Sequence, residues 1–246
     1  MLPTGRLQAM IIPVDQWTPR EAPTNAALDG EWIGLRPWNA DHHAEALWHE
    51  FGGDGTDHSC TAHLHHFGWG EIASPKRLAA ILDDLNARDE FRTCVFVTPD
   101  GRPVGMASYI RWDIANGVAE TGAVATGRSI ARTPAATEAH ALMMRRIFDE
   151  LGYRRYEWKL NDPNAASHKA AQRMGFSFEG VFRQHQVKPY GNRDTAWYSM
   201  LDWEWPARRA AFEAWLSPQN FEADGTQREG LRDLVERFTD ERPRRP

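Results

Sequence analysis

Apolar residues recur three or four positions apart in several segments, the spacing that places them on one face of an α-helix. The clearest case follows Ser74 and Pro75, a typical cap and first position of a helix. Its apolar face consists of Leu78, Ile81, Leu82 and Leu85. Further helices are predicted from Asn39 to about Phe51, from the turn at 127–137 to Leu151, after Asn164, from Pro206 to Trp215, and over 228–238.

Shorter apolar runs bounded by glycine, proline or polar residues are typical of β-strands. They fall at 31–37, 91–98, 104–112, 118–125, 153–159, 176–182 and 194–201. The turn at 99–103 predicts a hairpin between the second and third of these strands. Residues 1–28 contain several prolines and little periodicity, which predicts an extended arm, and 242–246 are expected to fray.

Composition narrows the class of protein. The chain has 246 residues, a net charge of -5 and a pI near 6.1. This length suits one domain with appendages, and the acidic balance argues against a nucleic-acid partner. The chain contains no apolar run approaching the ~20 residues of a membrane span and no secretory signal, so we expect no membrane and a cytoplasmic location. Cys60 and Cys94, the only cysteines, suit free thiols in a reducing compartment.

The turn before the long helix is a candidate anion site. A helix start offers free N–H groups and the positive end of the helix dipole, which can hold a pyrophosphate. Thr133 can cap this helix, and Pro134 suits its first turn. Ala135 and Ala136 leave room for a ligand near the backbone. Arg128 and Arg132 add positive charge. The alternative is an ordinary capped helix with two surface arginines.

Asn164 and Ser167 lie one turn apart at the start of a short predicted helix that ends at Gly175-Phe176. Both side chains are expected to project from the same helix end. The Asn164 carboxamide can bind the amides of a pantetheine arm, and the Ser167 hydroxyl can contact a thioester sulfur. Alternatively, Asn164 is simply the helix cap.

Glu120 lies in the strand before the anion turn, on the same face as Gly122 and Val124. A carboxylate on a central strand is costly unless it meets water, a partner or a substrate. It could accept a proton from an incoming amine, either directly or through water. The alternative is a salt-bridged residue of the sheet.

Residues 57–66 contain several histidines and Cys60, but their spacing fits no familiar zinc site. We therefore expect no metal, and interpret this loop as a wall of the acceptor pocket. His140 in the long helix and His168 beside Ser167 are interpreted as packing or surface residues.

Residues 29–203 resemble the GNAT superfamily of N-acetyltransferases, and within it the ribosomal-protein N-acetyltransferase-like branch. The segments 33–37 and 118–122, together with Asn164, Ser167 and the Gly-Phe ending, carry the likeness. It implies an α+β (α/β) fold, with a central mixed, mostly antiparallel sheet of six to seven strands flanked by helices. Residues 1–28 would be an N-terminal arm and 204–246 a helical C-terminal extension.

The resemblance also implies roles for residues. Glu120 would be the general base, and Ser167 the acid toward the thiolate, since Ala171 replaces the tyrosine that other members use. Acetyl-CoA would be the co-substrate. The residues expected to bind it are Ala123, Val124, Arg132, Thr133, Pro134, Ala135, Ala136, Thr137, Asn164 and Ser167. The family's phosphate loop has the pattern Gln/Arg-x-x-Gly-x-Gly/Ala, which aligns with 131–136. In this chain the basic residue is shifted by one position, Pro134 replaces the first glycine, and only the last small residue, Ala136, fits.

These features predict direct acetyl transfer to a primary amine, with a protein or peptide α-amine as one acceptor. Two alternatives stay open: a small-molecule amine such as an antibiotic or polyamine, and acyl-CoA binding without turnover. The aromatic residues beyond Trp203 are expected to pack onto the domain, with a homodimer as the other option.

Overall fold

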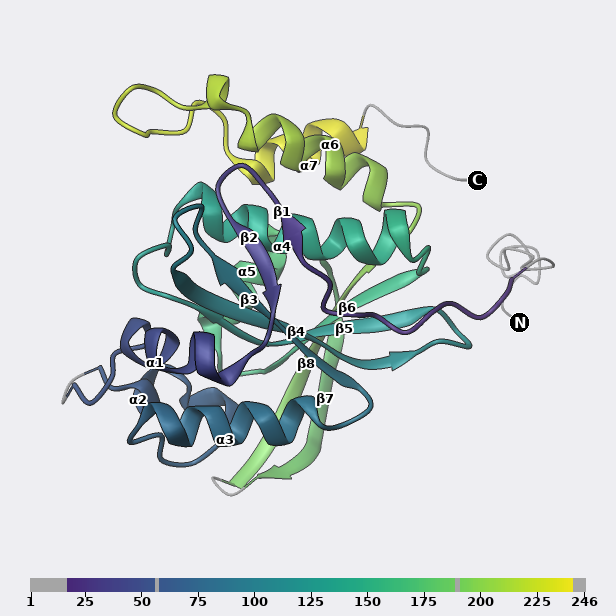
Figure 1. Ribbon diagram of the computed structural model, residues 1–246. Coiled ribbons are helices and arrows are strands. Elements are labelled where there is room, and N and C mark those ends of the chain that lie inside the picture. The colour runs from purple at the N-terminus through teal and green to yellow at the C-terminus, as the bar shows by residue number, and fades with distance from the viewer. Residues whose placement is uncertain (1–16, 56–57, 189–190, 241–246) are drawn as a thin grey trace, which may run out of the picture.

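A single eight-stranded sheet forms the centre of the computed structural model, which describes residues 17–55, 58–188 and 191–240 (Figure 1). Its strands are β1 (Leu28–Asp29), β2 (Gly34–Pro37), β3 (Phe91–Val97), β4 (Pro103–Asp113), β5 (Val118–Thr126), β6 (Arg155–Asn161), β7 (Ser177–Lys188) and β8 (Gly191–Leu201). They lie in the order β1-β2-β3-β4-β5-β6-β8-β7. Each neighbouring pair is antiparallel except β5 and β6.

The predicted mixed, mostly antiparallel sheet is confirmed, but it has eight strands instead of six to seven. The additional strand is β1, whose Leu28 and Asp29 pair with Leu35 and Gly34 of β2. A strand of two residues is too short to show an alternating pattern, so the sequence assigned Leu28 to the arm.

The helices are α1 (Ala40–Glu50), α2 (Cys60–His63), α3 (Pro75–Asn86), α4 (Pro134–Arg145), α5 (Ala165–Arg173), α6 (Trp205–Leu216) and α7 (Leu231–Asp240). Short 3-10 turns lie at His65–Phe67 and Pro218–Asn220. Two predicted caps are confirmed. Asn39 Oδ1 accepts from His42 N, and Ser74 Oγ accepts from Arg77 N with Pro75 in the first turn.

Two helical predictions need correction. The segment 57–66, interpreted as a loop, contains α2, which Ser59 caps by accepting from Ala62 N. The long helix also does not stay α-helical to Leu151. It widens into a π turn, η3 (Arg146–Glu150), and Leu151 N donates to Arg146 O. In this wider turn Ile147 and Phe148 are both buried.

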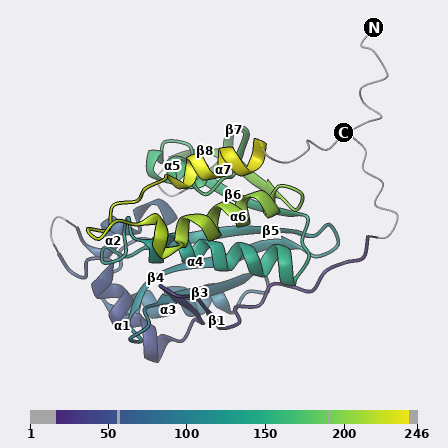
Figure 2. The same ribbon diagram turned by 90° about the horizontal axis from the view of Figure 1, so that it is seen from above.

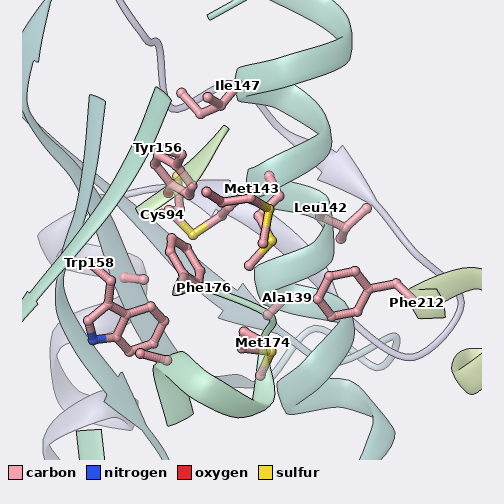
Figure 3. Close-up of a cluster of buried hydrophobic side chains, with 14 of the residues drawn as sticks. Cys94, Ala139, Leu142, Met143, Ile147, Tyr156, Trp158, Met174, Phe176 and Phe212 are labelled. Atoms are coloured by element: carbon pink, nitrogen blue, oxygen red, sulfur yellow. The ribbon is translucent and has the colours of Figure 1, made fainter. Parts of the chain in front are cut away.

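Helices cover both faces of the sheet, so the protein has two cores (Figures 1 and 2). On one face, α1, α2 and α3 bury a cluster that includes Leu47, Phe51, Leu78 and Leu82. On the other face, α4 and α5 pack against the larger cluster. Figure 3 shows Met143 of α4 and Ile147 of η3 facing the sheet side chains, with Phe212 of α6 beside α4.

The C-terminal segment packs onto the core, as predicted. α6 lies beside α4, and α7 lies beside α6 (Figure 2). Trp205, Phe212 and Trp215 of α6 are buried in the same cluster as α4, together with Leu231 and Leu234 of α7. The predicted fraying of 242–246 lies outside the described residues.

The part of the arm that the structure describes is anchored to the domain. Arg20 N donates to Ile114 O at 3.0 Å, and Tyr153 Oη donates to Glu21 O at 2.9 Å. Residues 1–16 of the predicted arm lie outside the described part of the chain.

The hairpin of β7 and β8 is longer than predicted. β7 continues past Phe182 to Lys188, and β8 begins at Gly191 instead of Asp194. β7 is the edge strand and is mostly exposed, so its polar run at 183–186 carries no apolar alternation. Among the described helices, none is long and apolar enough to cross a membrane.

Candidate active site

A cleft opens where the two parallel strands in the middle of the sheet separate. The β5–β6 pairing runs from Val118 opposite Arg155 to Thr121 opposite Trp158. Beyond that point, residues of both strands line a cleft of about 700 Å³. A cavity of this size is in the range of small-molecule sites.

A bulge in β5 shapes this cleft. Ala123 has a φ of +47°, a conformation that residues other than glycine seldom adopt. The pairing with β4 shifts in register at the same place, between Met106 and Ser108. A bulge takes backbone groups out of the regular ladder, and both Ala123 and Val124 line the cleft. Their N–H groups are therefore candidates for polarising a carbonyl oxygen.

The cleft collects residues that the sequence analysis chose separately. Glu120, Ala123 and Val124 of β5 line it together with Asn164 and Ser167 at the start of α5. Asn164 Oδ1 accepts from Ser167 N at 3.1 Å, so Asn164 does cap the helix. The same carboxamide lines the cleft, so its Nδ2 is the group suited to a ligand carbonyl.

The Ser167 hydroxyl is oriented by a neighbouring tryptophan. Trp158 Nε1 donates to Ser167 Oγ at 2.9 Å. An indole N–H is only a donor, so Ser167 acts as the acceptor in this bond. The Ser167 hydroxyl can therefore donate its own proton to another group, and a sulfur atom in the cleft would be a suitable acceptor.

Glu120 is the buried carboxylate of the cleft, with 1% of its surface exposed. Arg111 binds it through two nitrogens, one of them Nε, which donates to Oε2 at 2.8 Å. Lys159 Nζ lies 3.0 Å from Glu120 Oε2 and 2.6 Å from Glu157 Oε2. The two cations compensate the buried negative charge. The salt-bridged interpretation therefore describes the environment of Glu120 correctly.

Arg111 and Lys159 were not among the residues predicted from the sequence. Arg111 follows Ile110, which pairs with Glu120, so regular alternation would place it on the opposite face. Its φ of +47° lies in a second irregular stretch of the β4–β5 pairing, and this bend brings the guanidinium to Glu120. Lys159 could have been found from the sequence. It lies two residues from Glu157 in the same strand and therefore on the same face of the sheet.

The predicted pyrophosphate residues lie apart from the cleft lining, around the start of α4. Arg132 is exposed with a φ of +65°, Pro134 and Ala136 are half-buried, and Ala135 and Thr137 are buried. One local prediction was wrong, since Thr133 makes no side-chain cap. Its hydroxyl instead donates backward to Ile130 O at 2.7 Å. The Thr137 hydroxyl accepts from Arg173 at 2.9 Å.

Of the His-rich segment 57–66, His66 lines the cleft, and so do Phe67 and Trp69, which follow it. That this wall belongs to the acceptor pocket stays a prediction. The ring of His63 stacks on Phe51 at 5.1 Å. Within the described residues, no group of three or more His, Cys, Asp or Glu side chains could hold a metal. His140 packs against Phe96 and Trp158, as expected for a packing residue.

The donors that the cleft offers fit an acyl thioester on a pantetheine arm. The backbone N–H groups of the bulge, the Asn164 carboxamide and the Ser167 hydroxyl are neutral groups that suit amides, a carbonyl and a sulfur. The helix start of α4, with Arg132 exposed beside it, suits phosphates. A mixed sheet that opens between two parallel strands, with this set of donors, defines an acyl-CoA-dependent transferase.

Comparison with known proteins gives the family. Residues 33–177 match the family model described as an acetyltransferase (GNAT) domain. A GCN5-related N-acetyltransferase from Brucella melitensis is 39% identical, with a TM-score of 0.82, and the match covers 90% of this chain and 99% of that one. A probable acetyltransferase of the GNAT family from Chromobacterium violaceum is 35% identical, with a TM-score of 0.73, covering 80% and 96%. The chain belongs to the GNAT superfamily.

A third structure shares the fold at greater distance. The ribosomal-protein-S5-alanine acetyltransferase from Vibrio fischeri has a TM-score of 0.53 at 14% identity, covering 72% of this chain and 97% of that one. No curated protein matches the chain. The protein is an N-acetyltransferase of the GNAT type, a class that uses acetyl-CoA as co-substrate together with an acceptor.

Proposed function

We propose that this enzyme transfers the acetyl group directly to an α-amine, with a protein or peptide terminus as the leading acceptor. The observation that carries the proposal is the convergence of Glu120, the Ala123–Val124 bulge and Ser167 on one cleft. The likeness to the ribosomal-protein acetyltransferase supports only the fold, so the acceptor is argued from chemistry.

In this mechanism the amine nitrogen attacks the acetyl carbonyl carbon, and the bond from that carbon to sulfur breaks. The bulge N–H groups stabilise the oxyanion that forms in between. The amine loses one proton to Glu120 through water, and the departing thiolate gains one from the Ser167 hydroxyl, which water reprotonates. No covalent intermediate on the enzyme is required.

Glu120 can accept that proton while its ion pairs remain in place. A carboxylate offers about four lone-pair sites, and Arg111 and Lys159 occupy three of them. One site is left for a water molecule. An α-amine has an ordinary pKa near 8, against about 10.4 for a lysine side chain. Because an α-amine is more readily deprotonated, a carboxylate acting through water suits it better.

For the co-substrate, we propose that the helix start over Arg132–Thr137 holds the pyrophosphate and that Asn164 binds the pantetheine arm. Only the N–H groups of the first turn of α4 are required for the phosphates, so Pro134 is compatible with binding. The side chain of Ala135 is small and buried, so it does not keep a phosphate away from the backbone at this position.

The experiment compares Glu120→Gln and Ser167→Ala with wild type in acetyl transfer to a peptide α-amine. We expect kcat to fall by about 10²–10⁴ in Glu120→Gln, and less in Ser167→Ala because water can replace the hydroxyl. Calorimetric binding of acetyl-CoA should stay unchanged in Glu120→Gln.

Glu90→Gln is the matched control, because Glu90 is another glutamate of the cleft lining but is exposed. Glu120→Gln also removes the partner of two cations, so kcat is measured over a range of pH as well. A base role predicts that the deficit of Glu120→Gln becomes smaller as the pH rises past the ordinary pKa of an α-amine, near 8, because more of the acceptor is then already deprotonated. Full turnover in that variant would contradict the mechanism.

A further inference from the structure

The charge of the cleft lining points to the kind of acceptor, because it is opposite in sign to the net charge of the whole protein. The chain as a whole carries a net charge of -5. The cleft lining nevertheless contains more basic than acidic side chains. The basic ones are Arg88, Arg111, Lys159, Lys188 and Arg193, and the acidic ones are Glu90 and Glu120.

Three of these cations already have acidic partners. Arg111 and Lys159 bind Glu120, and Arg88 lies 2.6 Å from the Asp84 carboxylate. Lys188 and Arg193 differ from them, since neither forms an ion pair with any residue that the structure describes. They are therefore the cations that a ligand could neutralise.

Both residues belong to the long hairpin that extends over the cleft. Lys188 ends β7 opposite Gly191, and Arg193 of β8 pairs with Gln186. Both side chains are half-buried. Arg193 Nε is enclosed with no hydrogen-bond partner in the described structure, and so is Oε1 of Gln186, the residue opposite it. The part of the Arg193 guanidinium that lines the cleft has no acidic partner among the described residues, so it can bind a ligand oxyanion.

The positive charges also act on one another. Burial first, and then the charges of Arg193 and Arg111, lower the pKa of Lys188. Burial, His65 and Arg193 likewise lower the pKa of His66, which also lines the cleft and is kept neutral. Arg111, Lys188 and Arg193 thus face a common space in which like charges repel. Such an arrangement attracts anions and repels cations.

We propose that Lys188 and Arg193 bind an anionic group, a carboxylate or a phosphate, carried by the same molecule as the acceptor amine. This inference rests on the proposed transfer to an amine and names its substrate class. It excludes polyamines as good acceptors, because every additional positive charge would enter a positive wall. An arginine beside a lysine suits such oxyanions well, through charge-assisted hydrogen bonds.

The test measures kcat/KM for matched acceptors that carry an anionic, a neutral or a cationic group beside the amine. One set consists of a peptide with glutamates after its first residue and the same peptide with glutamines or lysines. A second set compares β-alanine with β-alaninamide, and phosphoethanolamine with ethanolamine. We expect the anionic member of at least one set to exceed its neutral partner about tenfold, and the lysine peptide to be poorest. The set that shows the preference identifies the source of the anion.

Lys188→Gln and Arg193→Gln should each reduce the anionic preference severalfold, and Lys188→Glu should invert it toward the lysine peptide. Arg183→Gln is the matched control, because Arg183 is an exposed cation of the same hairpin outside the cleft lining. The affinity for acetyl-CoA should stay unchanged in all of them. If the hairpin variants weaken acetyl-CoA binding and leave the acceptor preference intact, the cations serve a coenzyme phosphate and the proposal is overturned.

A failure of the proposed acetyl transfer can be distinguished from a failure of the anion site. If wild type acetylates none of these amines, calorimetric binding of the same acidic and amide compounds replaces turnover as the readout. Tighter binding of the acidic compounds, lost in Lys188→Gln, would support the anion site without catalysis. Equal binding of both would overturn it.

Discussion

At the scale of the residue, the protein uses several ionisable side chains in their neutral form inside the core. Burial raises the pKa of both thiols, Cys60 and Cys94, to about 12. Burial, and then the charge of Arg173, lowers the pKa of His140 to about 4. These groups therefore have a structural role. They lower the free energy of unfolding at any pH at which they would be charged in the unfolded chain but stay neutral in the folded one.

His140 gives a prediction about pH and stability. Its ordinary pKa is about 6.5, so between pH 6.5 and 4 the unfolded chain binds a proton that the folded chain does not. Folding is favoured above pH 6.5, and the free energy of unfolding falls as the pH decreases through this window. The slope from this residue is about 1.4 kcal/mol per pH unit. Urea unfolding at several pH values measures it.

His140→Phe should reduce that slope by the contribution of about one proton, because phenylalanine does not titrate. Phenylalanine also keeps an aromatic ring between Phe96 and Trp158. Some slope will remain, since burial also lowers the pKa of His43 and His63. An unchanged slope in the variant would show that His140 is not buried in its neutral form.

Residue types were easier to predict than residue partners. Glu120, Asn164 and Ser167 could be chosen from the sequence because each belongs to a local motif. Arg111 could not, because its contact with Glu120 depends on a backbone bend that breaks the strand alternation. The Thr133 cap failed because the threonine hydroxyl bonds its own turn instead.

At the scale of the element, segments with a strong local signal were predictable. The capped helices α1 and α3 begin where Asn39 and the Ser74–Pro75 pair indicated. Elements whose form depends on neighbours were not. The two-residue β1 exists only because β2 pairs with it, and the outer part of β7 only because β8 does.

Glu138 connects two elements and gives a second prediction. Its carboxylate accepts from the backbone N–H groups of Glu31, Trp32 and Ile33 at 2.9, 2.6 and 2.9 Å. This fastens the turn before β2 to helix α4. Glu138→Ala would leave these donors without their acceptor, and we expect a loss of about 3 kcal/mol in the free energy of unfolding.

Urea unfolding measures this loss. Glu213→Ala is the control, because the Glu213 side chain is 71% exposed, and it should change stability by less than about 0.5 kcal/mol. A Glu138→Ala variant as stable as this control would mean that the turn finds other acceptors.

At the scale of the whole molecule, the C-terminal helices belong to the core and support the site. Arg173 of α5 lies 4.8 Å from the ring centre of Trp215 in α6, and it donates to Thr137 of α4. Through this arginine the extension is connected to the helix that presents Asn164 and Ser167.

Trp215→Ala should therefore lower the free energy of unfolding by about 3–5 kcal/mol, since Trp215 is buried. The control is Trp203→Ala, because Trp203 is 45% exposed, and we expect it to cost less than about 1 kcal/mol. Equal unfolding midpoints for the two variants would mean that the extension only rests on the surface.

The strand order has a consequence for how the protein is made. β8 is inserted between β6 and β7, although it is the last of the three strands to leave the ribosome. Until Gly191–Leu201 has been synthesised, β6 has a bare edge at the middle of the future sheet. That interval lasts on the order of a few seconds, during which a nascent chain can pair wrongly. A message truncated before residue 191 would leave its product permanently in this state, and we expect cellular chaperones and proteases to recognise it.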